Sequence, residues 1–231
     1  MIKCMLCQQV IQQPITLKWL FSFERWERGY LCDRCRQEFT KISQHEQCLG
    51  CGRSLIGGKL CADCVMWQKQ GKILLKNSSL YTYNEAMQKY FERYKFLGDY
   101  YWRKIFASEF QKYIKVNYPP KDGWEYVVIP IDQTTQEKRR FNQVKGLVSD
   151  LPTQDLLGVK ERNKRKQSQK NRQERLKTPQ PFYLLSEVGD LSDKKILLID
   201  DIYTTGRTLY HAQALLLQRG ASQVCSVTLA R

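Results

Sequence analysis

The sequence predicts an α/β fold, a parallel sheet covered by helices, behind an N-terminal cysteine-rich module. Three observations lead to this expectation. Eight of the nine cysteines precede residue 65, apolar runs alternate with helix-like segments after residue 80, and the clearest apolar run (residues 196–199) ends in two carboxylates and a loop of hydroxyl residues. Strands that are apolar almost throughout are typical of parallel sheets with both faces covered.

The composition of the 231 residues excludes several classes of protein. With 42% hydrophobic and 12% aromatic residues, the chain has enough apolar side chains for a packed core, which excludes wholesale disorder. No apolar run reaches the roughly 18 residues of a spanning helix, and the first residues lack the apolar stretch of a secretory signal. We therefore expect a cytoplasmic protein without a transmembrane segment. The net charge of +15 indicates an anionic partner, such as nucleic acid or a phosphorylated small molecule.

The eight N-terminal cysteines form four CxxC pairs. Each pair directs two thiolates at one metal ion, and two pairs complete the tetrahedral sulfur shell that suits zinc. A disulfide framework is disfavoured because a cytoplasmic chain keeps its thiols reduced. We expect two structural Zn²⁺ ions, each held by pairs adjacent in sequence; a cross-braced arrangement of the first pair with the third is the alternative. The expected ligands are Cys4, Cys7, Cys32 and Cys35 for one ion and Cys48, Cys51, Cys61 and Cys64 for the other.

These pairs also set the expected domain boundaries. A segment of this size has too small an apolar core to fold alone, so metal binding would supply most of its folding free energy. We expect a double zinc-ribbon module over residues 1–66, a polar linker over residues 67–79 and the α/β domain over residues 80–231.

The α/β domain begins with a helical pattern. Between residues 84 and 116 apolar residues return every three or four positions, with a break at Gly98. Aromatic and basic residues interleave there, which fits a buried stripe or a platform for stacked bases; we expect the buried stripe. Further strands are expected over residues 125–131, 156–159, 181–185, 194–200 and 224–230, and helices over residues 141–152 and 207–220.

The most informative segment follows the strand that ends at residue 200. Ligands of open α/β sheets bind beyond the carboxyl ends of the strands. There, Asp200 and Asp201 can accept hydrogen bonds from two vicinal hydroxyls or hold a hydrated Mg²⁺. The next residues join backbone N–H groups and threonine hydroxyls to a helix N-terminus, which favours a phosphate. We expect a sugar-phosphate site whose phosphate-binding residues are Tyr203, Thr204, Thr205, Gly206, Arg207 and Thr208, with Asp200 and Asp201 as catalytic residues.

This segment resembles the phosphoribosyl-diphosphate (PRPP) binding motif of type I phosphoribosyltransferases. The resemblance implies a type I phosphoribosyltransferase-like domain that binds PRPP, with Mg²⁺ on the diphosphate. Tyr203 stands where salvage enzymes carry an aliphatic residue, and Arg207 stands where a small residue is frequent.

A longer series of motifs resembles the ComF family. In chain order these are the CxxC pairs, residues 94–99 (YKFLGD), residues 128–130 (VIP), residues 139–143 (RRFNQ) and the phosphate loop. Family members carry RGFNQ, so Arg140 occupies the position of the family's glycine. The resemblance implies a late-competence role in natural transformation, at the inner face of the membrane. It further implies handling of single-stranded DNA with a DNA-translocating ATPase, ComFA, contacted through the zinc module.

The positive charge is concentrated between residues 137 and 177, where thirteen Lys or Arg residues accompany five acidic ones. A single diphosphate needs only a few cations, whereas a nucleic-acid backbone uses many. A solvated surface is the alternative for such a charge run. We expect polyanion contacts from Lys95, Arg139, Arg140, Arg162, Lys164, Arg165 and Arg172.

Three functions remain open from the sequence. The first is a protein that binds and guides single-stranded DNA. The second is a phosphoribosyltransferase that acts on an unidentified base or nucleotide. The third is a PRPP-responsive sensor in which the ligand releases DNA. Salt-dependent DNA binding, diphosphate release, and competition between PRPP and DNA distinguish the three.

Overall fold

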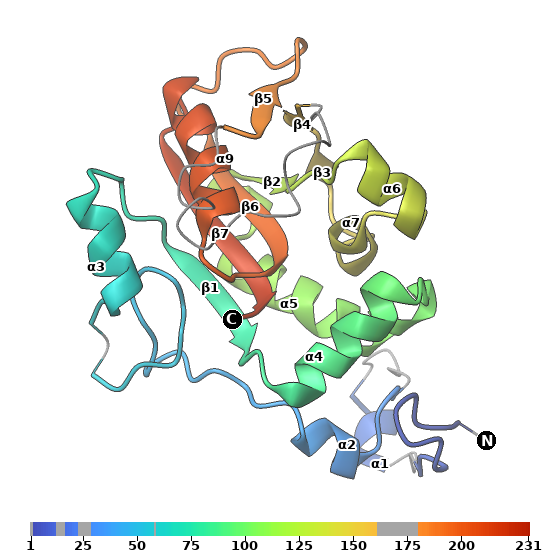
Figure 1. The fold of residues 1–231 in the computed structure, drawn as a ribbon. Helices are drawn as coiled ribbons and strands as arrows, with labels where there is room; N and C mark the ends of the chain where they lie inside the picture. Colours follow the sequence, from blue (N-terminus) through green and yellow to red (C-terminus); the bar gives the residue numbers. More distant parts are fainter. Residues whose placement is uncertain (1, 13–16, 23–28, 58, 161–179) are drawn as a thin grey trace, which may run out of the picture.

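The computed structural model describes residues 2–12, 17–22, 29–57, 59–160 and 180–231. At its centre is a five-stranded sheet, parallel throughout, with the order β1-β7-β6-β2-β3 (Figure 1). A separate antiparallel pair joins β4 to β5. This architecture confirms the predicted α/β fold class. The strands are β1 (Asn77–Tyr81), β2 (Trp124–Val128), β3 (Thr153–Gln154), β4 (Leu157–Val159), β5 (Phe182–Leu184), β6 (Lys195–Ile202) and β7 (Gln223–Ala230).

Helices pack on both faces of the sheet. The first face is covered by α4 (Glu85–Phe91), the 3-10 helix η2 (Tyr100–Ile105), α5 (Ala107–Asn117) and α7 (Gln143–Leu147). The second face is covered by α3 (Ala62–Lys69) and α9 (Arg207–Gln218). The remaining described helices are α1 (Leu17–Leu20), α2 (Asp33–Gln37), the π-helix η1 (Glu92–Phe96), the 3-10 helix η3 (Pro120–Asp122) and α6 (Gln133–Arg139).

In strand β6, apolar residues do not alternate with polar ones because both faces of the strand are buried. Leu197 and Ile199 belong to the core on the first face, and Ile196 and Leu198 belong to the core on the second. All four side chains are fully buried. A strand buried on both sides needs apolar residues at every position, whereas a strand with one solvated face alternates.

The helical segment predicted between residues 84 and 116 is interrupted near Gly98, which has a φ of +69°. Before that glycine, α4 continues directly into the π-helix η1; after it, η2 leads into α5. Tyr90, Tyr94 and Trp102 are buried in the core of the first face. These aromatic rings therefore pack in the interior and present no platform for bases.

The cysteine-rich segment is built into both cores of the molecule. Cys4 and Cys35 belong to the core on the first face, which they share with residues of α4 and α5. Cys48 and Cys64 belong to the other core, which they share with residues of α9. In Figure 1, α1 and α2 lie below α4, whereas α3 lies beside β1 on the other side of the sheet. The cysteine pairs thus pack against the sheet at two different places.

Residues 67–79, which we expected to be a polar linker, are partly folded into these elements. Helix α3 extends to Lys69, and β1 begins at Asn77 as the edge strand beside β7. The polar side chains of β1 are buried because they pair with polar side chains of β7: Ser226 Oγ donates to Asn77 Oδ1 at 2.8 Å, and the hydroxyls of Ser79 and Thr228 lie 2.8 Å apart. Within the described ranges, no helix combines the length and apolar character needed to cross a bilayer.

Candidate functional site

Two adjacent carboxylates stand near the carboxyl end of β6. Asp201 is buried, and its Oδ2 lies 2.8 Å from Nζ of Lys95. Burial raises the pKa of Asp200 to about 7, and the negative charge of Asp201 adds to that shift. The backbone N–H of Asp201 donates to Oδ1 of Asp200 at 2.9 Å. One carboxylate is thus held by a cation, while the other ionises near neutral pH.

Lys95, whose ammonium group pairs with Asp201, belongs to the π-helix η1. The wider turn of a π-helix is frequent at functional sites, and here it belongs to the YKFLGD motif. Lys95 reaches Asp201 with its side chain only 12% exposed, and its ammonium group lies 4.5 Å from the ring centroid of Phe91. The sequence predicts Lys95 as a polyanion contact; in the structure its charge compensates Asp201.

The predicted phosphate loop connects β6 to α9. Gly206 precedes the helix with a φ of +77°, a left-handed conformation that glycine adopts without a steric penalty. Thr204, Thr205 and Thr208 are exposed. Three hydroxyls and the N-terminus of a 12-residue helix are therefore accessible beside the two carboxylates. The donors present fit the phosphate of a ribose phosphate.

Tyr203 turns its side chain away from this site. It is 3% exposed, and its ring packs so close to Gly206 that a Cβ atom there would collide with it. The guanidinium of Arg231 lies 4.7 Å from the centroid of the same ring. Arg207 is partly buried, with its Nε 3.5 Å from Nε2 of His211. The backbone N–H of Tyr203 donates to the carbonyl of Ala230 at 2.9 Å, so Tyr203 offers a phosphate neither its side chain nor its N–H.

A cavity of about 1050 Å³ opens at the carboxyl end of β2. Lys95 lines it and also binds Asp201, so the cavity adjoins the carboxylate pair. Among the described residues of the lining, Asp155 alone is acidic, and it pairs with Lys145 at 2.8 Å. The basic residues of the lining are Lys95, Lys138, Arg139, Arg140 and Lys145, and its aromatic residues are Tyr100 and Phe141.

The RRFNQ motif builds one wall of this cavity. Arg140 ends α6 in the left-handed conformation, with a φ of +63°. Asn142 then begins α7, and its Oδ1 accepts hydrogen bonds from the backbone N–H groups of Val144 and Lys145 at 2.8 and 3.1 Å. The sequence pointed to Arg139 and Arg140 but not to Lys138, Lys145 or Phe141, although the motif marked the place. Tyr100 was expected in a buried stripe, whereas it is 42% exposed. The predicted contacts Arg162, Lys164, Arg165 and Arg172 lie outside the described residues.

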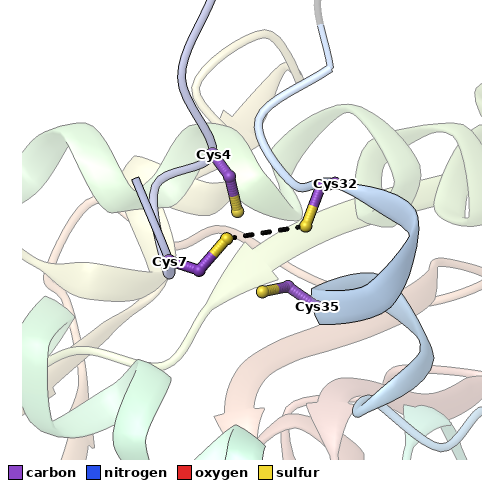
Figure 2. Close-up of side chains that lie close together, drawn as sticks. All are labelled: Cys4, Cys7, Cys32 and Cys35. Atoms are coloured by element: carbon purple, nitrogen blue, oxygen red, sulfur yellow. Dashed lines mark hydrogen bonds between the residues drawn. The ribbon is translucent and has the colours of Figure 1, made fainter. Parts of the chain in front are cut away.

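The first cysteine cluster gathers Cys4, Cys7, Cys32 and Cys35, whose Sγ atoms lie within 4.8 Å of one another. Figure 2 shows the four side chains converging, and Sγ of Cys7 lies 3.6 Å from Sγ of Cys32. A tetrahedral zinc site with bonds of about 2.3 Å separates its sulfur atoms by about 3.8 Å, whereas a disulfide needs about 2.05 Å. The cluster therefore has the dimensions of a metal site.

The second cluster gathers Cys48, Cys51, Cys61 and Cys64, all of them buried. The Cys48–Cys64 and Cys51–Cys61 sulfur separations are both 3.6 Å. The hydrogen bond with Cys64 lowers the pKa of Cys51 to about 4, with help from the charge of Arg231, and the same hydrogen bond raises the pKa of Cys64. In both clusters the structure brings together pairs adjacent in sequence, so the cross-braced alternative is wrong.

Fold and site together define an α/β domain of the phosphoribosyltransferase type that carries two tetracysteine groups able to hold metal ions. The family model of the phosphoribosyl transferase domain matches residues 139–231. The chain is 39% identical over 229 residues to "Competence protein ComFC" of Streptococcus pneumoniae (strain ATCC BAA-255 / R6), covering 99% of this chain and 100% of that protein. It is 35% identical over 232 residues to "Competence protein ComFC" of Bacillus subtilis (strain 168), covering 99% of this chain and 94% of that protein. The chain belongs to the ComFC family of competence proteins, which confirms the resemblance found in the sequence.

Proposed function

We propose that this chain handles single-stranded DNA during natural transformation, on a domain whose phosphate loop binds PRPP or a related ribose phosphate. Membership of the ComFC family supports the competence role. The observation that carries the DNA-handling part is the basic cavity beside Asp201.

The lining of this cavity suits a single strand. Lys138 and Arg140 are exposed cations that can neutralise backbone phosphates. Tyr100 is 42% exposed, and its ring centroid lies 5.0 Å from that of Phe141. Aromatic side chains in a basic groove stack with bases of any sequence. The volume of about 1050 Å³ is at the upper end of the usual range for small-molecule sites, about 300–1,000 Å³, so there is room for a nucleotide together with its neighbouring phosphates.

The test is fluorescence anisotropy of a labelled oligothymidine over a series of salt concentrations. Each phosphate contact that is lost reduces the slope of log affinity against log salt by about 0.7 for a single strand. We expect the double variant Lys138→Gln/Arg140→Gln to bind the oligonucleotide more weakly. Its slope of log affinity against log salt should be smaller by about 1.4, the value for two lost phosphate contacts. The matched control is Lys121→Gln in η3, an exposed lysine before the opposite end of β2. Equal effects of the two replacements, or no binding of the parent protein at low salt, contradict the proposal.

A second function, phosphoribosyl transfer, is favoured by the carboxylates beside the loop. In this reaction Asp200 and Asp201 would interact with the ribose hydroxyls, and a Mg²⁺ ion bound with the diphosphate would stabilise its negative charge. The assay is release of diphosphate from PRPP with Mg²⁺ and a panel of bases, with Asp200→Asn as the impaired variant. If the parent protein releases no diphosphate with any base of the panel, phosphoribosyl transfer is contradicted. Adding PRPP to the anisotropy assay also tests the sensor function, because a sensor requires PRPP and the oligonucleotide to compete.

We further propose that α1 and the first cluster contact a DNA-translocating ATPase of the ComFA type, at the cytoplasmic face of the membrane. Leu17 at the start of α1 and Phe21 directly after that helix are 74% and 73% exposed. Helix α1 lies beside α2 (Figure 1), and such an apolar surface suits a protein partner. We expect Leu17→Gln with Phe21→Gln to abolish co-purification with the ATPase while DNA binding is retained. Ile73→Gln is the matched control, since Ile73 is 68% exposed between α3 and β1. Unchanged co-purification in the double variant contradicts this interface.

Two zinc ions are proposed for the cysteine clusters, whose all-sulfur ligand sets and spacing suit that metal. Four thiolates at each site leave no open coordination position, so these ions would be structural. Elemental analysis of the purified protein is expected to give two zinc ions per chain.

A further inference from the structure

Arg231 connects the second cysteine cluster directly to the phosphate loop. Its side chain is 8% exposed. Nη1 donates to the backbone carbonyls of Tyr203 at 3.1 Å and Thr204 at 2.6 Å, while Nη2 donates to Sγ of Cys51 at 3.6 Å. Nη2 also lies 3.6 Å from Oδ2 of Asp63, between the ligands Cys61 and Cys64. One buried guanidinium thus contacts both the loop and the metal-binding segment.

Trp67 makes a second, independent connection. It lies on α3, three residues after Cys64, and its Nε1 donates to the backbone carbonyl of Thr205 at 3.2 Å. Its ring packs against that of Tyr210 on α9, with the centroids 4.6 Å apart. The hydroxyl of Tyr210 in turn accepts a hydrogen bond from the backbone N–H of Leu75 at 3.4 Å. The start of α9 is therefore also held to the segment that follows the cluster.

Together these residues hold three consecutive carbonyls of the loop, those of Tyr203, Thr204 and Thr205. In a planar trans peptide the N–H of each following residue points opposite to the carbonyl. The N–H groups of residues 204–206 therefore point away from the cysteine cluster. Among the described residues, no group accepts a hydrogen bond from these three N–H groups. They are oriented as donors to a bound anion.

The cluster itself is fixed to the sheet. The backbone N–H of Asn77 donates to the carbonyl of Gly50 at 2.6 Å, and Nδ2 of Asn77 donates to the carbonyl of Cys51 at 3.0 Å. Gly52 has a φ of +69°, and a Cβ atom there would lie 2.8 Å from the backbone oxygen of Asn77. This close packing on β1 gives the contacts from Cys51 and Trp67 a rigid base.

We propose that metal at the second cluster holds the phosphate loop in its binding conformation, with Arg231 and Trp67 as the positioning residues. Without the ion, the four thiols lose their common ligand, and Cys51 and Trp67 are no longer fixed with respect to the loop. The loop N–H groups then lose their common orientation, so affinity for a phosphate falls. The first cluster packs on the other core and has no such connection in the described residues. The ligand part of this inference rests on the proposed binding of a ribose phosphate.

The first readout needs no ligand. Hydrogen–deuterium exchange of the zinc-loaded chain measures how firmly the segment from Tyr203 to Tyr210 is held, through the hydrogen-bonded amides at its two ends, which donate to the carbonyls of Ala230 and Gly206 at 2.9 Å. We expect Trp67→Phe, which keeps a ring but lacks the indole N–H, and Arg231→Gln each to raise the exchange rate of this segment at least about tenfold, equivalent to about 1.4 kcal/mol. Zinc content should remain unchanged in both variants. The matched control is Lys69→Gln, because Lys69 is an exposed residue of α3 two positions after Trp67; exchange of the loop should not change in this variant.

The second readout is calorimetric titration with ribose 5-phosphate and with PRPP. We expect Trp67→Phe and Arg231→Gln to weaken both affinities about tenfold and Lys69→Gln to leave them unchanged. Loss of metal from the second cluster in Cys51→Ser should increase loop exchange, whereas Cys7→Ser in the first cluster should not. Unchanged loop exchange in Trp67→Phe and Arg231→Gln, or equal effects of Cys7→Ser and Cys51→Ser, overturns the inference. Failure of the parent protein to bind either phosphate overturns the proposed ligand instead. The exchange measurement still tests whether the second cluster holds the phosphate loop in place.

Discussion

At the carboxyl end of β6, two neighbouring aspartates have different surroundings. Lys95 lies 2.8 Å from Asp201 and compensates its charge, whereas burial and the adjacent carboxylate raise the pKa of Asp200 to about 7. A group that ionises near neutral pH can change its protonation state during binding or catalysis. The two aspartates therefore differ: Asp201 is paired with a lysine, and Asp200 ionises near neutral pH.

This difference predicts how stability depends on pH. An aspartate in the unfolded chain ionises near pH 3.9, so between about pH 4 and pH 7 the folded chain retains a proton at Asp200 that the unfolded chain has lost. Stability therefore falls as pH rises through this window and remains low above it. Asp200→Asn removes the effect, and we expect it to stabilise the protein at pH 8 by up to about 4 kcal/mol, at 1.4 kcal/mol per pKa unit. Melting temperatures across the pH range test this: the gain should shrink toward pH 5, and a gain independent of pH contradicts the assigned pKa.

Arg140 has a backbone conformation that suits glycine. Its φ is +63°, in a region that costs residues with a Cβ atom about 1–2 kcal/mol. The ComF motif carries glycine here, so we expect Arg140→Gly to stabilise the chain by about 0.5–1 kcal/mol after the greater backbone entropy of unfolded glycine is included. Arg140→Ala removes the charge but keeps the Cβ atom, so it separates the two effects. Thermal denaturation should place glycine above alanine and arginine; equal melting temperatures for glycine and alanine would contradict the conformational explanation.

At the scale of single elements, the strands show which features the sequence could predict. The apolar run of β6 identified a strand buried on both faces, and the two carboxylates after that run marked the site. Strand β1 was missed because its Asn77, Ser78 and Ser79 suggest a solvated linker, although all three are buried. Their burial depends on polar partners in β7, about 150 residues away in sequence, and no local pattern shows such a partner. The cavity could not be predicted for the same reason, because the segments that line it are distant in sequence.

The two cysteine clusters differ in burial, and this predicts their rates of metal loss. Cys7 of the first cluster is exposed and Cys32 is partly exposed, whereas all four cysteines of the second cluster are buried. A chelator therefore reaches the first ion more readily. We expect zinc release into a chromogenic chelator to show two phases of equal amplitude, with the fast phase lost in Cys7→Ser and the slow phase lost in Cys51→Ser. A single phase, or loss of the slow phase in Cys7→Ser, contradicts this assignment.

On the scale of the whole molecule, each cysteine cluster packs into one of the two hydrophobic cores, which lie on opposite faces of the sheet. The first cluster packs under the helices of one face, and the second packs with α9 on the other. Positive charge gathers instead around the cavity, where the part of the lining that the structure describes has five basic residues and one acidic residue. The two groups able to hold metal ions therefore lie on opposite faces of the sheet, and the basic cavity lies at its carboxyl edge.

Because the second cluster and the sheet share one core, they are expected to unfold together. Leu75 is fully buried between α3 and β1 in that core, so Leu75→Ala should destabilise the protein by about 2–5 kcal/mol. Denaturation followed by far-ultraviolet circular dichroism and by release of the slowly exchanging zinc should give coincident transitions, both shifted equally by Leu75→Ala. Ile73→Ala is the control, since Ile73 is 68% exposed and surface replacements change stability by no more than about 0.5 kcal/mol. Release of that zinc before the loss of secondary structure would instead show that residues 1–66 fold as an independent module, as a solvated linker over residues 67–79 would allow.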